Sequence, residues 1–272
     1  MAVETVEPSS VRVHVGGLIR HCRRRAGVTQ KWLAHETHVS ESLEGAYERG
    51  ERIPSAGFLI DADRLTAAEG TLTPCVELME QEPSRAQFQE WRLLEAEALS
   101  LGAYVTMVIP GLLQTPDYIR ELHRSRVPAL RSEEIDELTQ ERLERQAVLV
   151  RENAPTVSFV IEEAALHRPL GGNAVLKAVL LHAVTTAREL AHVTLQVMPT
   201  VTQTHAGLSG SLEILFSPDG RDSIFLEGQD RSRLLTRPAE AVQHRDRYGA
   251  LRGEALSPGK SLELIEKVAG EL

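Results

Sequence analysis

The sequence predicts an α+β protein in which a small all-α bundle precedes a larger mixed α/β domain. In the first quarter of the chain, apolar residues recur at three- and four-residue steps in short segments, which is typical of small amphipathic helices. Later, helical patterns alternate with short apolar runs such as TVSFVI and VTLQVM, which indicate buried strands. A chain of 272 residues, 42% of them hydrophobic, is long enough to bury a sizeable core.

The first quarter of the chain contains repeated start and stop signals for helices. Gly27 and Gly50 are placed to end helices, while Thr29 and Ser40 are good N-caps for the helices that follow. We therefore expect several short helices within about sixty residues, compact enough for one bundle. The predicted helices cover residues 13–26, 30–36, 40–49 and 55–68.

The rest of the chain mixes helices and strands. The segment YVTMVIPGLLQTPDY is turn-like because it contains two prolines and a glycine. SPDGRD separates two apolar runs and predicts a hairpin. The predicted helices cover about 80–101, which links the domains, and then 131–152, 174–190, 239–250 and 260–270; the predicted strands cover 156–161, 193–198, 210–216 and 223–226. The predicted limits are 1–10 for a disordered lead-in, 11–73 for the bundle and 74–272 for the α/β domain.

Charge and composition exclude several classes of protein. The net charge is −9, but residues 1–66 hold nine basic and nine acidic residues, so the remaining residues carry the whole excess. A polybasic binder of nucleic acid or membrane is therefore excluded, and any DNA contact must use locally arranged charge. The first ten residues lack a signal-peptide pattern and the apolar runs are short, which predicts a cytoplasmic protein without membrane contact. Cys22 and Cys75 form no metal-binding spacing, and we expect no metal or cofactor.

Two short predicted helices joined by a three-residue turn, the second capped by a serine, match a helix-turn-helix. The segment GVTQKWLAHETHVSESLEGAYERGERIP resembles the Xre family of bacterial helix-turn-helix regulators. The positions that carry the resemblance are Gly27, Thr29, Gln30, Leu33-Ala34, Val39-Ser40, Glu48-Arg49-Gly50 and Pro54. The resemblance implies a transcriptional regulator that binds double-stranded DNA as a homodimer.

The resemblance also implies roles for individual side chains. The first turn of the second of these helices faces bases, and the residues near its end reach phosphates. The implied DNA-binding residues are Gln30, Lys31, Ser40, Glu41, Ser42, Ala46, Arg49 and Arg52. Arg23 and Glu48 are implied as an ion pair inside the bundle, which removes one glutamate from the surface that faces DNA.

Glu44 departs from the family pattern, which has an aliphatic residue at this position. Because Leu43 and Tyr47 are four residues apart and can cover a core face together, we expect a slightly rotated helix that leaves Glu44 at the edge. The alternative is a helix-turn-helix with weakened or lost DNA affinity. Glu41 does not argue against DNA binding, since a glutamate can accept a hydrogen bond from a cytosine amino group.

Three segments of the second domain also resemble a family. They are Trp91-x3-Glu95 with VIPGLLQTPDY, RLERQ, and IEEAALHRPLGG. They are similar to the uncharacterised C-terminal domain that is fused to Xre-type modules in actinobacterial regulators of development and antibiotic production. This resemblance implies a small acidic partner protein, encoded nearby, whose binding changes DNA occupancy. Some such pairs resemble toxin–antitoxin systems.

Candidate partner- or ligand-binding residues lie in these segments: Trp91, Gln114, Tyr118, Arg142, Arg145, Gln146, Glu163 and Arg168. Arg142 and Arg145 are three residues apart on one predicted helix and can hold an anionic group together. They can equally pair with Glu162 or Glu163, and we expect this internal pairing. The PGLLQTPDY segment is expected to be a structural loop that caps a helix, although Gln114 and Tyr118 offer polar groups to a partner.

Catalysis is not expected. Glu163 and His167 are four residues apart, but neither a third metal ligand nor an HExxH, GxSxG or P-loop pattern accompanies them. Three hypotheses remain open. The first is a DNA-binding regulator whose C-terminal domain senses a small partner protein or ligand. The second is an antitoxin-like protein-interaction module with a degenerate helix-turn-helix. The third is a ligand-binding or catalytic pocket around Arg145 and Glu163.

Overall fold

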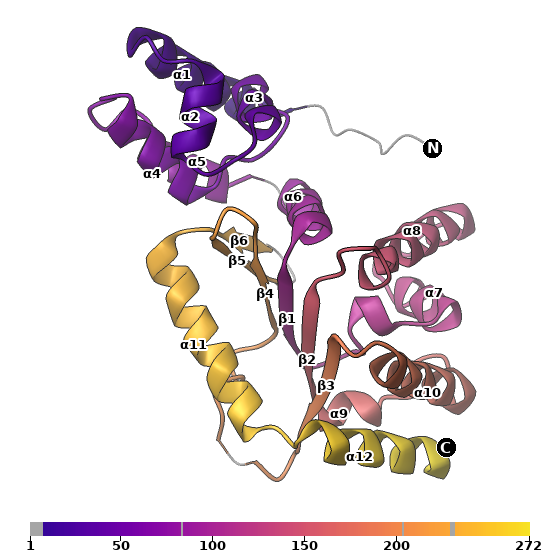
Figure 1. Ribbon diagram of the computed structural model, residues 1–272. Helices are drawn as coiled ribbons and strands as arrows, with labels where there is room; N and C mark the ends of the chain where they lie inside the picture. The colour runs from indigo at the N-terminus through magenta and orange to yellow at the C-terminus, as the bar shows by residue number, and fades with distance from the viewer. Residues whose placement is uncertain (1–7, 83, 203, 229–231) are drawn as a thin grey trace. The chain divides into compact units, whose positions relative to one another are not determined.

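The computed structural model describes residues 8–82, 84–202, 204–228 and 232–272, and it confirms the predicted α+β fold (Figure 1). The chain forms two compact units, each built from two stretches of sequence. The first unit contains residues 1–97 and 216–243, and the second contains 98–215 and 244–272. This division differs from the boundary predicted between residues 73 and 74, because α6 and the segment 216–243 belong with the N-terminal bundle.

The described part of the first unit begins with short helices, four of which start at a side-chain cap. Ser9, Thr29, Ser40 and Ser55 each accept a backbone N–H bond at the start of a helix. Gly50 adopts a left-handed conformation, with φ of 73°, and ends α3. The helices are α1 (Ser10–Arg25), α2 (Gln30–Glu36), α3 (Glu41–Arg49), α4 (Ala56–Leu65), α5 (Cys75–Glu80) and α6 (Ser84–Glu97). Helix α1 starts at Ser10, the last residue of the predicted lead-in, and residues 1–7 of that lead-in lie outside the described part.

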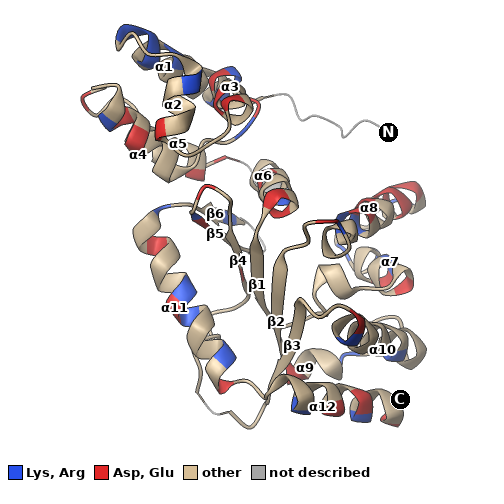
Figure 2. Ribbon diagram, viewed as in Figure 1, with Lys and Arg blue, Asp and Glu red and all other residues tan. Residues whose placement is uncertain are grey.

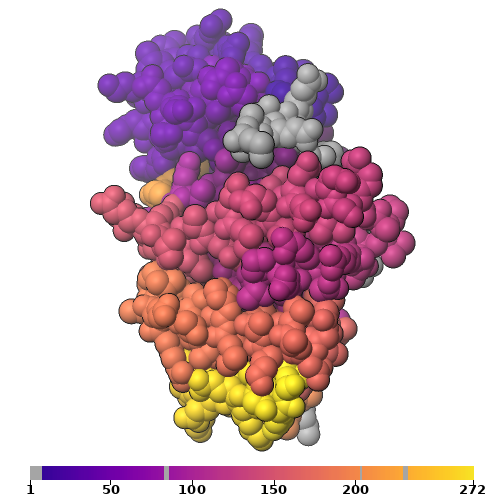
Figure 3. Space-filling model, turned by 90° about the vertical axis from the view of Figure 1, so that its right-hand side faces the viewer, coloured from indigo at the N-terminus to yellow at the C-terminus, as the bar shows by residue number. Residues whose placement is uncertain are grey.

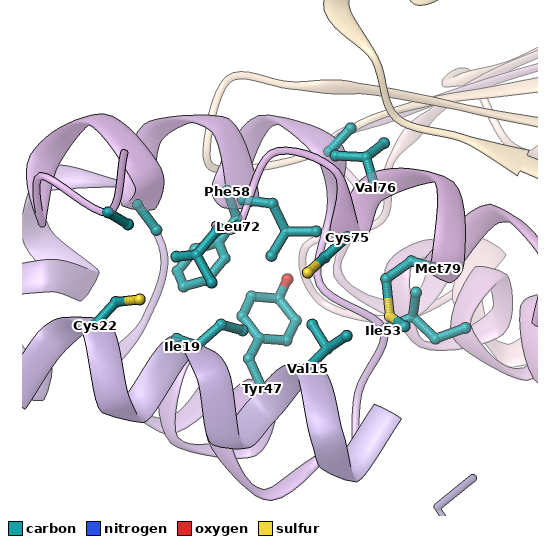
Figure 4. Close-up of a cluster of buried hydrophobic side chains, with 14 of the residues drawn as sticks. Val15, Ile19, Cys22, Tyr47, Ile53, Phe58, Leu72, Cys75, Val76 and Met79 are labelled. Carbon is teal, nitrogen blue, oxygen red and sulfur yellow. The ribbon is translucent and has the colours of Figure 1, made fainter. Parts of the chain in front are cut away.

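The bundle encloses one apolar core (Figure 4). Val15 and Ile19 of α1 are fully buried against Tyr47 of α3, whose ring lies 4.7 Å from that of Phe58. Cys22 and Cys75 are buried free thiols in this core. They are packing residues here, and burial raises the pKa of both.

The second stretch of the first unit adds a small β element. Strands β5 (Asp222–Leu226) and β6 (Arg233–Leu235) pair antiparallel, and α11 (Pro238–Glu254) starts after them. Trp91 of α6 is fully buried, with its ring stacked 5.4 Å from Phe225. The predicted SPDG turn is present, since the Ser217 N–H donates to the Arg221 carbonyl at 3.0 Å.

The second unit is built on a parallel sheet. Strands β1 (Ser100–Val105), β2 (Thr156–Glu162) and β3 (Val193–Met198) are parallel, and β4 (Leu212–Phe216) lies beside β1, in the order β3-β2-β1-β4. The other elements are η1 (Gly111–Leu113), α7 (Pro116–Arg124), α8 (Ser132–Arg145), η2 (Gln146–Leu149), α9 (Glu163–Leu166), α10 (Asn173–Glu189) and α12 (Pro258–Glu271).

Helices cover both faces of this sheet, as parallel sheets require. Helices α7, α8, α10 and α12 form a layer on one face, and Figure 3 views this layer from outside. The part of α11 from His244 onward covers the other face, where the Tyr248 hydroxyl donates to the Ser158 carbonyl at 2.7 Å.

Several sequence-based assignments in the second unit were wrong. Residues 100–105 form β1, where the linking helix was expected to end and the turn-like segment to begin, and α7 starts at Pro116, inside the end of that segment. The helix predicted for 131–152 ends at Arg145. A Cβ at Gly102 would lie 2.5 Å from the Tyr248 ring. This close packing depends on residues distant in sequence, which a local helical pattern does not register.

Candidate nucleic-acid interface

Helices α2 and α3 and their tight turn have the arrangement of a helix-turn-helix. The Val39 N–H donates to the Ala34 carbonyl at 2.9 Å, and the Thr37 hydroxyl donates to the Leu33 carbonyl at 2.7 Å. His38 takes a positive φ of 58° between them. These bonds close the C-terminal end of α2 and direct the chain into α3 at Ser40.

The first turn of α3 presents polar side chains to solvent. Ser40, Glu41 and Ser42 are exposed, and the Ser40 hydroxyl accepts the Leu43 N–H at 3.1 Å. Ala46 is partly exposed one turn later, and Lys31 is exposed at the start of α2. The predicted base-facing positions therefore lie at the accessible N-terminal end of α3, the part of a recognition helix that contacts base edges.

Glu48 joins the three helices from inside the bundle. Its carboxylate accepts from Arg23 Nε at 2.5 Å, from Gln30 Nε2 at 2.8 Å and from Arg20 Nε at 3.2 Å. Burial alone would raise the pKa of Glu48, but the hydrogen bonds, led by that from Arg23, lower it. One N–H of the Gln30 amide is thereby used, so a contact from Gln30 to DNA has to use the second N–H or the amide oxygen.

Glu44 is fully buried, and the predicted rotation that places it at the edge of the bundle was wrong. Leu43 is only partly buried, so α3 turns its Glu44 face toward α1. The reason is a close helix contact, since a Cβ at Gly16 would lie 2.5 Å from the Tyr47 carbonyl oxygen. Neither Glu44 oxygen accepts a hydrogen bond from a described N–H or O–H group, and the Arg23 Nε lies 3.6 Å away. In its protonated form Glu44 donates a hydrogen bond to the Glu48 carboxylate.

This environment changes the protonation of Glu44. Burial, and after it the neighbouring Glu48 carboxylate, raises the pKa of Glu44 to about 8. The side chain is therefore mostly neutral near pH 7. Together, the burial of Glu44 and of Glu48 removes two of the four glutamates of residues 39–54 from the surface.

The two arginines near the end of α3 differ in availability. Arg49 is exposed and forms two hydrogen bonds with the Glu51 carboxylate, at 2.7 and 2.8 Å. A phosphate can take the place of Glu51, because both side chains are solvated. Arg52 was predicted to reach phosphates, but it is not available to them. Its Nε lies 3.0 Å from both Glu90 oxygens, and the pair is largely buried.

Further positive charge lies on α1 (Figure 2). Arg20, His21, Arg24 and Arg25 line a shallow hollow on this helix, and Arg24 and Arg25 are exposed. The last turn of α1 contains three basic residues, Arg23, Arg24 and Arg25. Their positive charge complements the negative end of the helix dipole. The bundle, neutral by count, thus has a locally basic surface.

In the second unit, most candidate partner-binding residues hold the PGLLQ turn in place. Gln114 donates to the Ile109 carbonyl at 2.6 Å, and Arg142 donates to the Gln114 amide oxygen at 2.8 Å. Gln146 donates to the carbonyls of Gly111 and Gln114. Tyr118 is fully buried and accepts the Ile109 N–H at 3.3 Å. Tyr118, like Trp91 in the first unit, is a core residue that presents no surface to a partner.

The remaining candidates are not brought together. Arg145 lies 3.6 Å from Glu213, so the arginines pair with Gln114 and Glu213 instead of the expected Glu162 or Glu163. Glu163 accepts the Thr200 N–H at 2.7 Å, and Arg168 is exposed on the loop after α9. Among the described residues, no group of three or more His, Cys, Asp or Glu side chains is arranged to hold a metal ion.

Two polar clusters escaped the sequence analysis. At the carboxyl ends of β1 and β2, the Tyr104 hydroxyl donates to Glu162, and His205 Nε2 lies 3.4 Å from the same carboxylate. In the first unit, Asp63 accepts the N–H groups of residues 70, 72 and 73 at 2.7 to 2.8 Å. An acidic residue at the end of a helix before EGTLTP is a local signal for the second cluster. The cluster around Glu162 could be found only if β1 had been predicted, because Tyr104 lies on that strand.

Two family models match the chain, one in each part. A helix-turn-helix domain model matches residues 14–74, which supports a DNA-binding regulator. A domain of unknown function, DUF5753, matches residues 88–267. Neither the curated proteins nor the solved structures contain a match to the chain. None of the helices in the described part of the chain has the length and apolar composition needed to cross a membrane. Because the second match covers more than half of its length, the chain belongs to the DUF5753 family, here with an N-terminal helix-turn-helix domain.

Proposed function

We propose that this protein is a non-enzymatic, sequence-specific transcriptional regulator of the Xre type that binds DNA in the cytoplasm as a homodimer. One observation carries the proposal. The first turn of α3 exposes Ser40, Glu41 and Ser42, whereas Glu44 and Glu48 of the same helix are buried in the bundle. The surface left for DNA is thus polar at α3 and basic at Lys31 and on α1.

In this proposal α3 enters the major groove by its N-terminal end. Glu41 accepts a hydrogen bond from a cytosine amino group, and Ser42 bonds a neighbouring base edge. Lys31 and Arg49 contact phosphates, with Arg49 exchanging Glu51 for the phosphate. These phosphate contacts set affinity and salt dependence, while the α3 contacts set sequence preference.

The second unit is proposed to receive a signal, with a small acidic partner protein as the candidate implied by the family resemblance. The structure offers this partner limited positive charge, since Arg142 and Arg145 are engaged with Gln114 and Glu213. Arg168 is the exposed candidate. An antitoxin-like interaction module remains the second candidate function. It is favoured by the internal use of Gln30 and Arg52, which leaves fewer groups for DNA.

The proposal is tested by selecting bound duplexes from a random pool and measuring their affinity by fluorescence anisotropy. Lys31→Ala is expected to weaken all duplexes about equally and to lower the salt slope by about one. Glu41→Ala is expected to relax preference at one base pair, by about 1–3 kcal/mol.

Glu133→Gln, an exposed change on α8, serves as the control and is expected to leave both properties unchanged. Failure to select any sequence, even at low salt, would favour the interaction module. Sedimentation of the free protein tests the homodimer.

A further inference from the structure

A hollow of about 170 Å³ lies within the first unit, and every residue that lines it belongs to that unit. One side is formed by the helix-turn-helix, with His38 in the turn and Leu43 and Tyr47 on α3. The opposite side includes Met79 of α5 and Leu94 of α6. An engineered apolar cavity of about 150 Å³ accepts benzene. The hollow is therefore large enough for a ligand built on one ring.

The walls of the hollow are fixed by hydrogen bonds within the unit. Glu90 holds Arg52 and also accepts the Ile53 N–H at 3.1 Å. The Gln87 amide oxygen accepts the Leu234 N–H at 2.6 Å, and the Thr236 hydroxyl accepts the Ala56 N–H at 2.7 Å. A site with these supports is largely preformed, which lowers the ordering cost of binding.

The charge of the lining is negative. Its charged residues are Glu80, Glu90, Glu97, Asp219, Asp222 and Arg221. Glu80 and Glu90 are neutralised by Arg237 and Arg52, and Arg221 pairs with Asp61 at 2.7 Å.

Asp219 is a partly buried carboxylate of this lining that is only partly compensated. Within the described residues it forms no salt bridge, although it is only partly exposed and accepts the Arg221 N–H at 3.2 Å. Burial raises the pKa of Asp219, and the charge of Arg221, which acts in the opposite direction, offsets this effect only in part. A bound cation would relieve this desolvation.

We propose that this hollow binds a small organic monocation, with one apolar ring against Leu43, Tyr47 and Met79 and one ammonium group paired with Asp219. Apolar burial provides most of the affinity, and the carboxylate selects a cation over neutral and anionic molecules of the same shape. The Tyr47 ring lines the same space, and an aromatic face adds attraction for a cation.

The occupant would contact the turn and α3, the elements proposed to read DNA. A ligand that favours one position of α3 must change DNA affinity, and DNA must change ligand affinity by the same factor. This regulatory consequence rests on the proposed function, whereas binding itself does not.

The test is calorimetric titration of the full chain with three probes of similar shape: 2-phenylethylamine, 2-phenylethanol and 3-phenylpropionate. The amine is expected to bind at least about tenfold more tightly than the alcohol, with the carboxylate weakest. Asp219→Asn keeps the volume of the hollow. It is expected to lower the affinity for the amine to that for the alcohol. Leu94→Trp fills the hollow and is expected to abolish binding of all three. Glu133→Gln is the control in the second unit, and thermal melts verify that each variant folds.

Equal binding of the three probes, an unchanged amine affinity in Asp219→Asn, or no binding to the folded wild-type protein would each overturn the site. The amine titration is then repeated with the selected duplex. If the amine binds but leaves DNA affinity unchanged, the site stands and the coupling is wrong. If no duplex binds at all, the proposed function fails while the probe titrations still decide the site.

Discussion

The burial of Glu44 changes the interpretation of this residue. An acidic side chain in a helix proposed to read DNA suggests repulsion, yet the structure buries this one completely beside Arg23 and Glu48. A buried carboxyl group with weak compensation takes up a proton instead of remaining charged. Glu44 is therefore a cost to the stability of the bundle and not a charge on its DNA-facing surface.

The stability of the protein is predicted to fall with rising pH because of Glu44. The pKa of Glu44 is about 8 in the folded state and 4.5 for the free group. Between these values the folded state keeps a proton that the unfolded state has lost, so the free energy of unfolding decreases by up to ~1.4 kcal/mol per pH unit. Glu48 and Asp63, whose pKa values are lowered, act with the opposite sign below about pH 4.5, where stability is lost as pH falls.

Glu44→Gln keeps the shape of the side chain and removes its titration. Denaturant unfolding at pH 5, 6, 7 and 8 is expected to show the variant gaining stability relative to wild type as pH rises. The exposed Glu41→Gln on the same helix should track the wild-type curve. Parallel curves for wild type and Glu44→Gln over this window would refute the buried, protonated glutamate.

At the scale of elements, the contact between α1 and α3 determines where the recognition helix lies. The two helices approach closely at Gly16, where a Cβ would meet the backbone oxygens of Tyr47 at 2.5 Å and of Glu48 at 2.7 Å. The ion pairs of Glu48 with Arg20 and Arg23 then fix α3 along α1. Small residues at a helix crossing thus set the orientation of the residues proposed to read bases.

Gly16→Ala is expected to push α1 and α3 apart and to destabilise the protein by about 1–3 kcal/mol, as overpacking does. The chain offers a matched control in the neighbouring Gly17, where an added Cβ meets no atom within 4 Å. Gly17→Ala should stabilise the helix by about 0.5–1 kcal/mol. Thermal and denaturant unfolding of both variants measures the difference; similar effects at the two positions would contradict the proposed close crossing.

Local sequence signals predicted elements well where the elements depend on local chemistry. The helices of the bundle could be predicted from their serine and threonine caps and from Gly50, because capping acts within four residues. Strand β1 was missed because its residues were divided between the end of the linking helix and a turn-like segment, and its strand form depends on pairing with β2, more than fifty residues later. The hydrogen-bond partners of Arg142 and Arg145 were missed for the same reason.

At the scale of the whole molecule, the chain returns to its first unit after completing most of its second. Residues 216–243 provide β5, β6 and the Asp219 turn, and they line the same hollow as His38 and Tyr47. Sequence alone placed these residues in the C-terminal domain, since nothing local reveals partners that lie 147 to 180 residues earlier. The exposed residues of α3 could be predicted from a family pattern; the hollow behind α3 could not.

The distribution of the net charge of −9 along the chain matters more than its total. The acidic excess belongs to residues 67–272, while the N-terminal bundle is neutral by count and has its charge arranged locally. DNA recognition by such a bundle depends on a few placed groups, so it should be weak without the right sequence, and its affinity should fall with salt only in proportion to its few phosphate contacts.

The most direct test of the account is the affinity ratio between a selected duplex and a shuffled duplex of the same composition, measured by anisotropy at low and at physiological salt. The account predicts a ratio of at least about a thousandfold at physiological salt, with both affinities falling as salt rises. Equal affinity for the two duplexes at every salt concentration, or no binding to either, would contradict a DNA-reading function for α3.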